Sequence, residues 1–119
     1  MNIKTIRTNS KNKDFINLVK ELDVYLKITD EDEHDFYNQF NSIDVLKEVV
    51  VTYVDKFAVG CAAIKKFENS AVEVKRMFVL KEHRGTGVAQ QLLVALENWA
   101  KELGYRKCVL ETGIRQIEA

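Results

Sequence analysis

Three runs of β-branched, aromatic and small side chains, separated by turns of two or three residues, constrain the fold of this chain most strongly. The runs cover residues 49–54, 57–67 and 71–79. Turns this short join only neighbouring antiparallel strands, because a parallel connection needs about a dozen residues or more. The middle of the chain is therefore predicted to be an antiparallel meander.

The N-terminal part is predicted to hold one strand and two helices. Residues 3–7 have the composition of a short strand. Asn9 and Ser10 are candidate caps for a helix whose apolar side chains recur at helical spacing over residues 15–22. Residues 29–32 are typical of a second helix start, because threonine can cap and an acidic first turn stabilises a helix N-terminus.

The C-terminal part is predicted to form a helical crossover between parallel strands. Residues 89–103 have the clearest amphipathic pattern of the chain, and Gly104 is placed to end that helix. The strand expected at residues 107–112 would then lie parallel to the strand at 71–79. Residues 113–119 have the pattern of another helix beginning.

These elements predict an α/β domain of layered α+β type, in which helices flank a central mixed, mostly antiparallel sheet. A length of 119 residues suits one domain, and 46% hydrophobic with 30% charged residues is typical of a globular protein. The formal net charge of zero argues against nucleic-acid binding as the main function. No apolar run could span a membrane, and residues 1–4 lack the apolar region of a secretory signal. Cys61 and Cys108 lie in apolar stretches and are expected to be reduced core thiols, which favours a cytoplasmic protein.

The segment with the clearest chemical signal is the polar loop before the amphipathic helix, Arg84-Gly85-Thr86-Gly87-Val88-Ala89. The two glycines let backbone N–H groups approach an anion closely, and the helix N-terminus adds roughly half a positive charge. The charge pattern agrees, because residues 61–119 carry 10 basic and 7 acidic side chains. The loop is therefore predicted to bind a pyrophosphate, with a ligand-free connection between strand and helix as the alternative.

Two phosphate-binding motifs fit this loop poorly. A P-loop requires Lys followed by Ser or Thr after its last glycine, where this chain has Val88 and Ala89. A dinucleotide fingerprint requires glycine or alanine at the position of Gln90, and it requires a parallel βαβ unit. The strands before the loop are joined as hairpins, although Glu111 lies at a suitable distance for that fingerprint.

In its context, the loop resembles the acetyl-CoA-binding motif of the GNAT superfamily of N-acetyltransferases. The family pattern Gln/Arg-x-x-Gly-x-Gly/Ala is matched by Arg84, Gly87 and Ala89, after the hydrophobic strand at 74–79 and before the helix and the strand at 108–113. The resemblance covers nearly all of the chain. It implies one domain of acyl-CoA N-acyltransferase type over residues 1–119. Residues 1–48 would hold the first strand and the acceptor-side helices, and residues 49–119 the sheet and the acetyl-CoA-binding core.

The resemblance implies transfer of an acetyl group from acetyl-CoA, as cosubstrate, to a primary amine by direct attack. Backbone N–H groups of the loop would hold the CoA pyrophosphate, and the end of the preceding strand would splay at a bulge and pair with the pantetheine arm. The N–H of Val79 would polarise the acetyl carbonyl. Glu73 stands where several family members carry the general base, with a solvated strand carboxylate as the alternative. The implied cofactor-binding residues are Met77, Phe78, Val79, Arg84, Gly85, Thr86, Gly87, Val88 and Ala89.

The sequence constrains the acceptor site less. In the family layout the first two helices form part of the acceptor wall, which makes His34 and Tyr37 candidate substrate-binding residues. The acidic run at 31–35 is expected to be a solvated helix start rather than a metal site, because consecutive carboxylates on a helix point in different directions. This run and the neutral chain favour a small cationic amine over a protein lysine as acceptor.

The sequence departs from the family pattern at its C-terminus. The family usually continues after the equivalent of residues 111–113 into a helix, a strand pair and a Tyr that protonates the leaving thiolate, whereas this chain ends at Ala119. We therefore expect a C-terminally truncated version of the fold without that Tyr. A partner subunit or a homodimer would complete the sheet. A non-catalytic CoA-binding or interaction module is the alternative function.

Overall fold

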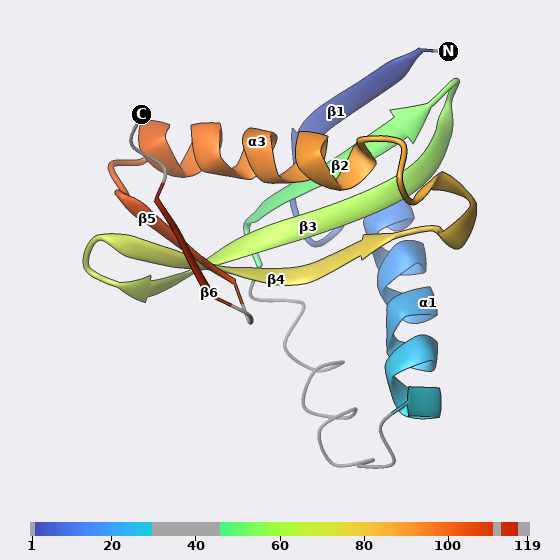
Figure 1. The fold of residues 1–119 in the computed structure, drawn as a ribbon, viewed down its shortest axis with the longest axis horizontal. Helices are drawn as coiled ribbons and strands as arrows, with labels where there is room; N and C mark the ends of the chain where they lie inside the picture. Colours follow the sequence, from blue (N-terminus) through green and yellow to red (C-terminus); the bar gives the residue numbers. More distant parts are fainter. Residues whose placement is uncertain (1, 30–45, 111–112, 117–119) are drawn as a thin grey trace.

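The computed structural model describes residues 2–29, 46–110 and 113–116, which form a six-stranded sheet with helices packed against it (Figure 1). The strands lie side by side in sequence order. They are β1 (Ile3–Thr8), β2 (Glu48–Val54), β3 (Phe57–Glu68), β4 (Ala71–Val79), β5 (Lys107–Leu110) and β6 (Gly113–Gln116). The helical elements are α1 (Lys13–Thr29), the 3₁₀ turn η2 (Lys81–His83) and α3 (Val88–Glu102).

The sheet is mixed and mostly antiparallel, as the sequence predicts. The pairs β1–β2, β2–β3 and β3–β4 are antiparallel, which confirms the meander. Only β4 and β5 are parallel, because α3 carries the chain back across the sheet between them. No helix in the described part of the chain is long and apolar enough to cross a membrane.

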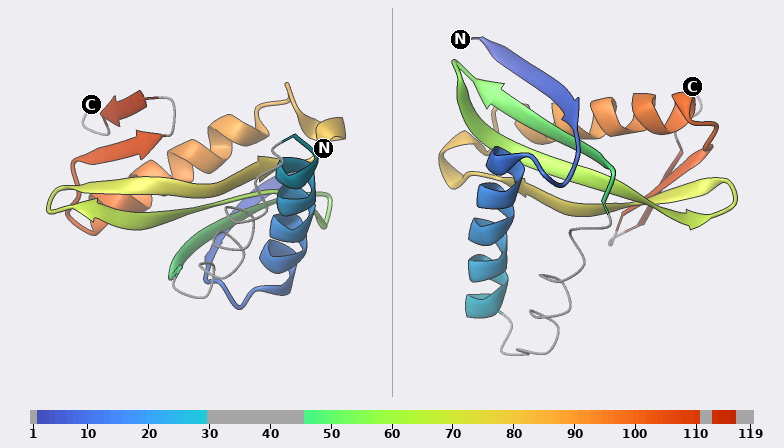
Figure 2. Two further views of the ribbon diagram at one scale, coloured as in Figure 1. Left: turned by 90° about the horizontal axis from the view of Figure 1, so that it is seen from below. Right: turned by 180° about the vertical axis from the view of Figure 1, so that it is seen from behind.

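The two long helices cover opposite faces of the sheet and build two separate cores (Figure 2). Val50 of β2 packs in a cluster with Leu92 and Leu96 of α3. Its neighbour Val49 packs on the other face with Phe15 of α1. Because successive strand residues point to opposite faces and both faces are covered, β2 is apolar almost throughout.

The ends of the helices show how local sequence sets the boundaries. The cap of α1 is Asn12, whose Oδ1 accepts the Phe15 N–H at 2.9 Å, so the expectation that Asn9 or Ser10 caps it is wrong. Asn9 instead stabilises the turn just before, where its Oδ1 accepts the N–H of Lys11. Helix α3 ends as predicted at Gly104, which has a φ of 95°.

The C-terminal segment differs from its prediction. Gly113–Gln116 form the strand β6, antiparallel to β5, instead of the start of a helix. Pairing with β6 supplies hydrogen-bond partners for backbone groups of β5 that would otherwise form a bare sheet edge. The second helix expected from residue 29 onward lies in the range 30–45, outside the described residues.

Candidate active site

The parallel strands β4 and β5 pair only over a short stretch of the described structure, where Ala71 to Glu73 lie beside Lys107 to Val109. Strand β5 ends at Leu110, whereas β4 continues beyond Glu73 to Val79 without pairing with β5. We call the side of β4 beyond Glu73, along which β5 does not pair with it, the splay. Glu73 lies at its vertex and the end of β4 lies at its mouth.

A β-bulge divides β4 into two halves. Cys61 of β3 lies opposite Phe78, but Ala63 lies opposite Lys75, so β4 carries one residue more than β3 between these two pairs. Arg76, with a positive φ of 55°, lies in this extra stretch, and its carbonyl accepts a hydrogen bond from the Cys61 thiol at 3.4 Å. A bulge of this kind bends its strand and interrupts the alternation of side chains.

The bulge decides which side chains of β4 face α1. Before the bulge, Lys75 shares the face of its partner Ala63, which belongs to the α1-side core, and so does Glu73 two residues earlier. After the bulge, Phe78 packs against the α1-side core and Val79 belongs to the α3-side core. If the unchanged sequence alternated strictly from Lys75 onward, without a bulge, the ring of Phe78 would lie on the α3 face.

The backbone of Val79 points into the splay. Val79 lies opposite Gly60 of β3, and the next N–H, that of Leu80, donates to the carbonyl of Val59 at 2.8 Å. This bond flanks a non-hydrogen-bonded antiparallel pair, so the N–H and the carbonyl of Val79 both point away from β3. The carbonyl accepts a hydrogen bond from Arg84 Nε at 3.0 Å. The N–H of Val79 is therefore directed to the side of β4 on which, among the described residues, β5 does not pair with it.

Short-range hydrogen bonds hold the loop after β4. The backbone N–H of Arg84 donates to the carbonyl of Lys81 at 3.3 Å, and its guanidinium carbon lies 5.9 Å from the centre of the Phe78 ring. The hydroxyl of Thr86 donates to the carbonyl of His83. These contacts fix the path of the loop over the end of β4.

Helix α3 begins without a capping side chain. Its N-cap residue is Gly87, which has a φ of 91° and makes no side-chain hydrogen bond, and the first turn contains no acidic residue. Gly85 also has a positive φ, of 79°. A Cβ atom at either glycine would meet no atom within 4 Å, so the space beside the loop is open among the described residues. The first N–H groups of an α-helix have no intrahelical acceptor, and the dipole makes that end positive.

Gly60 is a structural residue of the site that the sequence reading missed. A Cβ atom there would lie 2.9 Å from Cγ1 of Val88 and 3.1 Å from Cδ1 of Leu92. The first turn of α3 can therefore approach β3 closely only because residue 60 has no side chain. A glycine inside an otherwise apolar strand is a sequence signal for such an approach.

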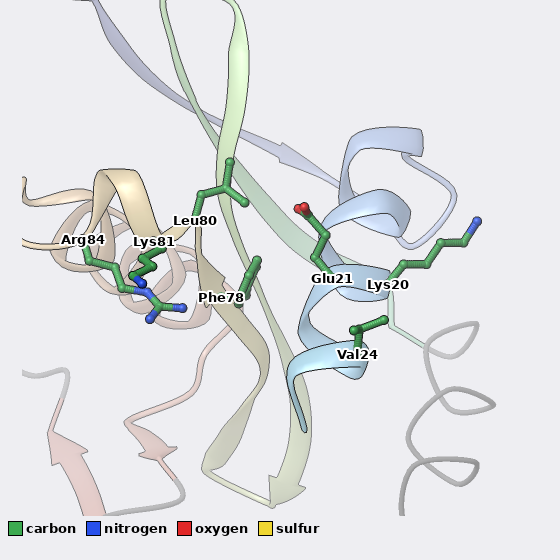
Figure 3. A pocket seen from close by; sticks show the side chains of 7 residues that line it. All are labelled: Lys20, Glu21, Val24, Phe78, Leu80, Lys81 and Arg84. Carbon is green, nitrogen blue, oxygen red and sulfur yellow. The ribbon is translucent and has the colours of Figure 1, made fainter. Parts of the chain in front are cut away.

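A pocket of about 490 Å³ lies between α1 and the end of β4 (Figure 3). Helix α1 forms one wall, and the end of β4 with the following loop forms the other. The lining residues are Lys20, Glu21, Val24, Phe78, Leu80, Lys81 and Arg84. The pocket thus adjoins both the mouth of the splay and the loop.

The end of β4 is bulged and does not pair with β5, and the loop after it leads to α3, whose N-cap residue is a glycine. This arrangement can offer backbone N–H groups to an elongated ligand with an anionic end. The model of the acetyltransferase (GNAT) family matches residues 14–119 of the chain. The chain belongs to the GNAT family. This confirms the family resemblance carried by Arg84, Gly87 and Ala89.

Relatives and solved structures agree with this assignment. The GNAT chain is 30% identical over 124 residues to the IAA acetyltransferase of Azospirillum brasilense, across 97% of this chain and 76% of that protein. Its fold is similar to that of a GNAT-family acetyltransferase from Staphylococcus aureus, with a TM-score of 0.65 and 19% identity over 92% of this chain and 72% of that one. It is also similar to N-acetylglutamate synthase from Neisseria gonorrhoeae, solved with coenzyme A and N-acetyl-glutamate. The TM-score there is 0.66 at 17% identity, over 92% of this chain and 25% of that one.

The GNAT structure brings most of the expected cofactor-binding residues together. Met77, Phe78 and Val79 form the end of β4, and residues 84–89 form the loop and the first residues of α3. Glu73 lies on the same strand but at the vertex, where its Oε1 is 2.8 Å from Nζ of Lys75. The candidate acceptor residues His34 and Tyr37 lie outside the described residues.

Other candidate groups have structural roles in the described chain. Burial raises the pKa of the Cys61 thiol to about 12, and both Cys61 and Cys108 are free and buried, as expected for core thiols. Lys65 and Lys66 pair with the start of β4, at the opposite end of the strand from the loop. The described residues contain no group of His, Cys, Asp and Glu side chains suited to a metal ion.

Proposed function

We propose that this chain binds acetyl-CoA in the splay and on the loop, and that it transfers the acetyl group to a primary amine. The observation that carries the proposal is the outward N–H of Val79, which lies at the mouth of the splay directly before the uncapped start of α3. In acetyl-CoA the thioester and the pyrophosphate lie at opposite ends of the pantetheine arm. The N–H of Val79 would serve the thioester, and the N–H groups at the start of α3 would serve the pyrophosphate.

The binding residues follow from this path. The pyrophosphate would accept hydrogen bonds from backbone N–H groups between Arg84 and Ala89, where the helix dipole favours negative charge. The pantetheine arm would pair with the free edge of β4 at Met77 to Val79, as an added strand would. Phe78 and Arg84 would border the arm on the α1 side.

The reaction we propose is direct attack of the amine on the thioester. The amine nitrogen forms a bond to the acetyl carbon, and the bond between that carbon and sulfur breaks. The CoA thiolate leaves and takes up the proton that the nitrogen releases when the amide forms. The N–H of Val79 would stabilise the negative charge that develops on the acetyl oxygen. An alkyl amine with a pKa near 10.4 is mostly protonated at neutral pH, so a base must first remove a proton.

Glu73 is our proposed base. It lies on the α1 face of β4, at the vertex of the splay. It lies six positions before Val79, which corresponds to about 20 Å along an extended strand. Glu73 would therefore act through a chain of water molecules in the splay, with Lys75 holding its carboxylate.

The experiment that tests the proposal is a calorimetric titration of the chain with acetyl-CoA. We expect micromolar affinity in the wild type and a loss of about 100-fold or more in Gly87→Glu, because the new carboxylate stands beside the pyrophosphate. The matched control is Gly104→Glu, since Gly104 also has a positive φ and open surroundings but lies at the other end of α3. No binding by the folded wild type, or equal affinity in the two variants, would contradict the proposal.

The distance between Glu73 and Val79 favours a second candidate function, a CoA-binding module without turnover. Thiol release from acetyl-CoA in the presence of a panel of amines separates the two. In an acetyltransferase, Glu73→Gln should lower turnover about 100-fold or more at unchanged acetyl-CoA affinity. In a binding module, the wild type should bind acetyl-CoA and release no thiol with any amine.

We also propose a location in the cytoplasm and assembly into a homodimer. Free, buried cysteines support a cytoplasmic protein. A homodimer stays a prediction that the elution volume of the chain can test.

A further inference from the structure

The pocket between α1 and β4 has an uneven distribution of charge. Among the described residues that line the pocket, Glu21 carries the negative charge, and it lies on the α1 wall. Lys81 and Arg84 are on the opposite, loop side. Figure 3 shows the Glu21 side chain turned toward the β4 side of the pocket, whereas the Lys20 ammonium is directed away from it.

The rest of the lining is apolar. Phe78 and Leu80 form the β4 wall, and Val24 lies beside Glu21 one turn further along α1. Val24 is 56% exposed, although it is a large apolar side chain on a helix that otherwise covers the sheet. A hydrocarbon or aromatic group in the pocket would therefore cover apolar surface that is in contact with water in the described structure.

We infer that Glu21 holds the ammonium group of the acceptor, and that the acceptor is a primary monoamine with an apolar body. This inference rests on the proposed acetyl transfer, and it assigns the substrate class and a specificity-determining residue to the same site. Glu21 makes no ion pair with other described residues, so its carboxylate is available to an ammonium group. The apolar body would lie against Val24, Phe78 and Leu80.

The same charges exclude two other classes of amine. An α-amino acid carries its carboxylate one carbon from the ammonium, so Glu21 would repel it. A diamine would place its second ammonium toward Lys81 and Arg84, which carry the same charge.

The test uses 2-phenylethylamine as the probe, titrated into the full chain in the presence of saturating CoA, which cannot react. Glu21→Gln should raise the dissociation constant of the amine about tenfold or more, because a hydrogen bond between charged groups is lost. The matched control is Glu68→Gln, which makes the same change at the β3–β4 hairpin, away from the pocket. Circular dichroism and CoA affinity should be unchanged in both variants.

Two further probes examine the substrate class. L-phenylalanine adds a carboxylate to the same skeleton, and 1,5-diaminopentane adds a second ammonium. Both should bind the wild type at least about tenfold more weakly than 2-phenylethylamine. Equal affinities for the three amines, equal binding by Glu21→Gln and the wild type, or no binding of 2-phenylethylamine would overturn the inference.

The outcome for the proposed function is read separately, from acetylation of the same amines with acetyl-CoA. Amine binding that depends on Glu21 without acetylation would support the inference and contradict catalysis. Acetylation of another amine at the same rate in Glu21→Gln would support catalysis and overturn the inference. If CoA does not bind, the amine titration without CoA still decides the role of Glu21.

Discussion

The two long helices of this protein begin in opposite ways. At α1, Asn12 accepts the N–H of Phe15, and Asp14 places a negative charge in the first turn. At α3, Gly87 has no side chain to offer and the first turn has no acidic residue. In the described part of the chain, the N-cap residue of α1 thus supplies a side-chain acceptor to its helix and the N-cap residue of α3 supplies none. The first arrangement contributes to stability, and the second suits an anionic ligand.

Among the substitutions near the two helix starts, Gly60→Ala should have the largest effect on stability and on acetyl-CoA affinity, because it disturbs the contact between β3 and the start of α3. The added Cβ would meet side-chain atoms of Val88 and Leu92 at 2.9 and 3.1 Å, so these side chains or the start of α3 must move away from β3. We expect the free energy of unfolding to fall by about 1–3 kcal/mol and acetyl-CoA affinity to fall with it. Urea denaturation and calorimetric titration measure the two effects. Gly104→Ala strains the other end of α3, and it should reduce stability alone.

Removing the cap of α1 should have a smaller effect, and on stability only. In Asn12→Ala, the N–H of Phe15 loses its side-chain acceptor, which should lower the free energy of unfolding by about 1 kcal/mol. Acetyl-CoA affinity should stay within twofold of the wild type, since α1 starts on the other face of the sheet. A large loss of affinity in this variant would show that the two helix starts are not independent.

The start of α1 also has a pH signature. Burial, and then a 2.6 Å hydrogen bond from its hydroxyl to Asp14, raise the pKa of Tyr53 to about 12. Because the folded state holds this proton more tightly than the unfolded state, the stabilisation is complete below about pH 10 and is lost as pH rises toward 12. Tyr53→Phe should cost roughly 1 kcal/mol at neutral pH. The stability of this variant should also decline less between pH 10 and 12 in denaturation experiments.

The smallest effect on stability and affinity is expected from an acidic residue in the first turn of α3, which α1 already has. Gln90→Glu gives the first turn of α3 an acidic residue, which should raise stability by about 0.3–1 kcal/mol through the helix dipole. The same charge should weaken acetyl-CoA binding by about two- to fivefold, since it competes with the phosphates. Asn98→Glu, about two turns further along the helix, serves as the control for added charge. An increase in affinity in Gln90→Glu would contradict a phosphate site at this helix start.

Features that depend on one segment could be predicted from the sequence. Hydrophobic alternation and short turns gave the three strands of the meander, and the amphipathic pattern gave α3 with its end at Gly104. The loop could be selected as a candidate site because glycines before a helix are a local signal, and both Gly85 and Gly87 have a positive φ in the structure.

Features that depend on two segments could not. The bulge at Arg76 is a mismatch in length between β3 and β4 that neither strand shows alone, so only the family resemblance implied a bulge in this strand. The role of Gly60 requires knowledge of which helix crosses the strand. The cap of α1 was misplaced because Asn9, Ser10 and Asn12 are all good capping residues and only the path of the backbone separates them. The pocket beside Glu21 was not foreseen, since it joins α1 to a strand some fifty residues away.

The extra residue in β4 has a consequence for anyone who redesigns this pocket. The alternation of side chains changes at the bulge: odd-numbered positions of β4 face α1 up to Lys75, and even-numbered positions do so from Phe78 onward. A substitution library built on a single alternating pattern would randomise the core in one half and the pocket in the other. Deleting one residue at the bulge would give β4 a single alternation of side chains along its whole length. Lys75 and Phe78 would then be two positions apart and would still share the α1 face, so β4 would pair with β3 without the bend that the bulge introduces.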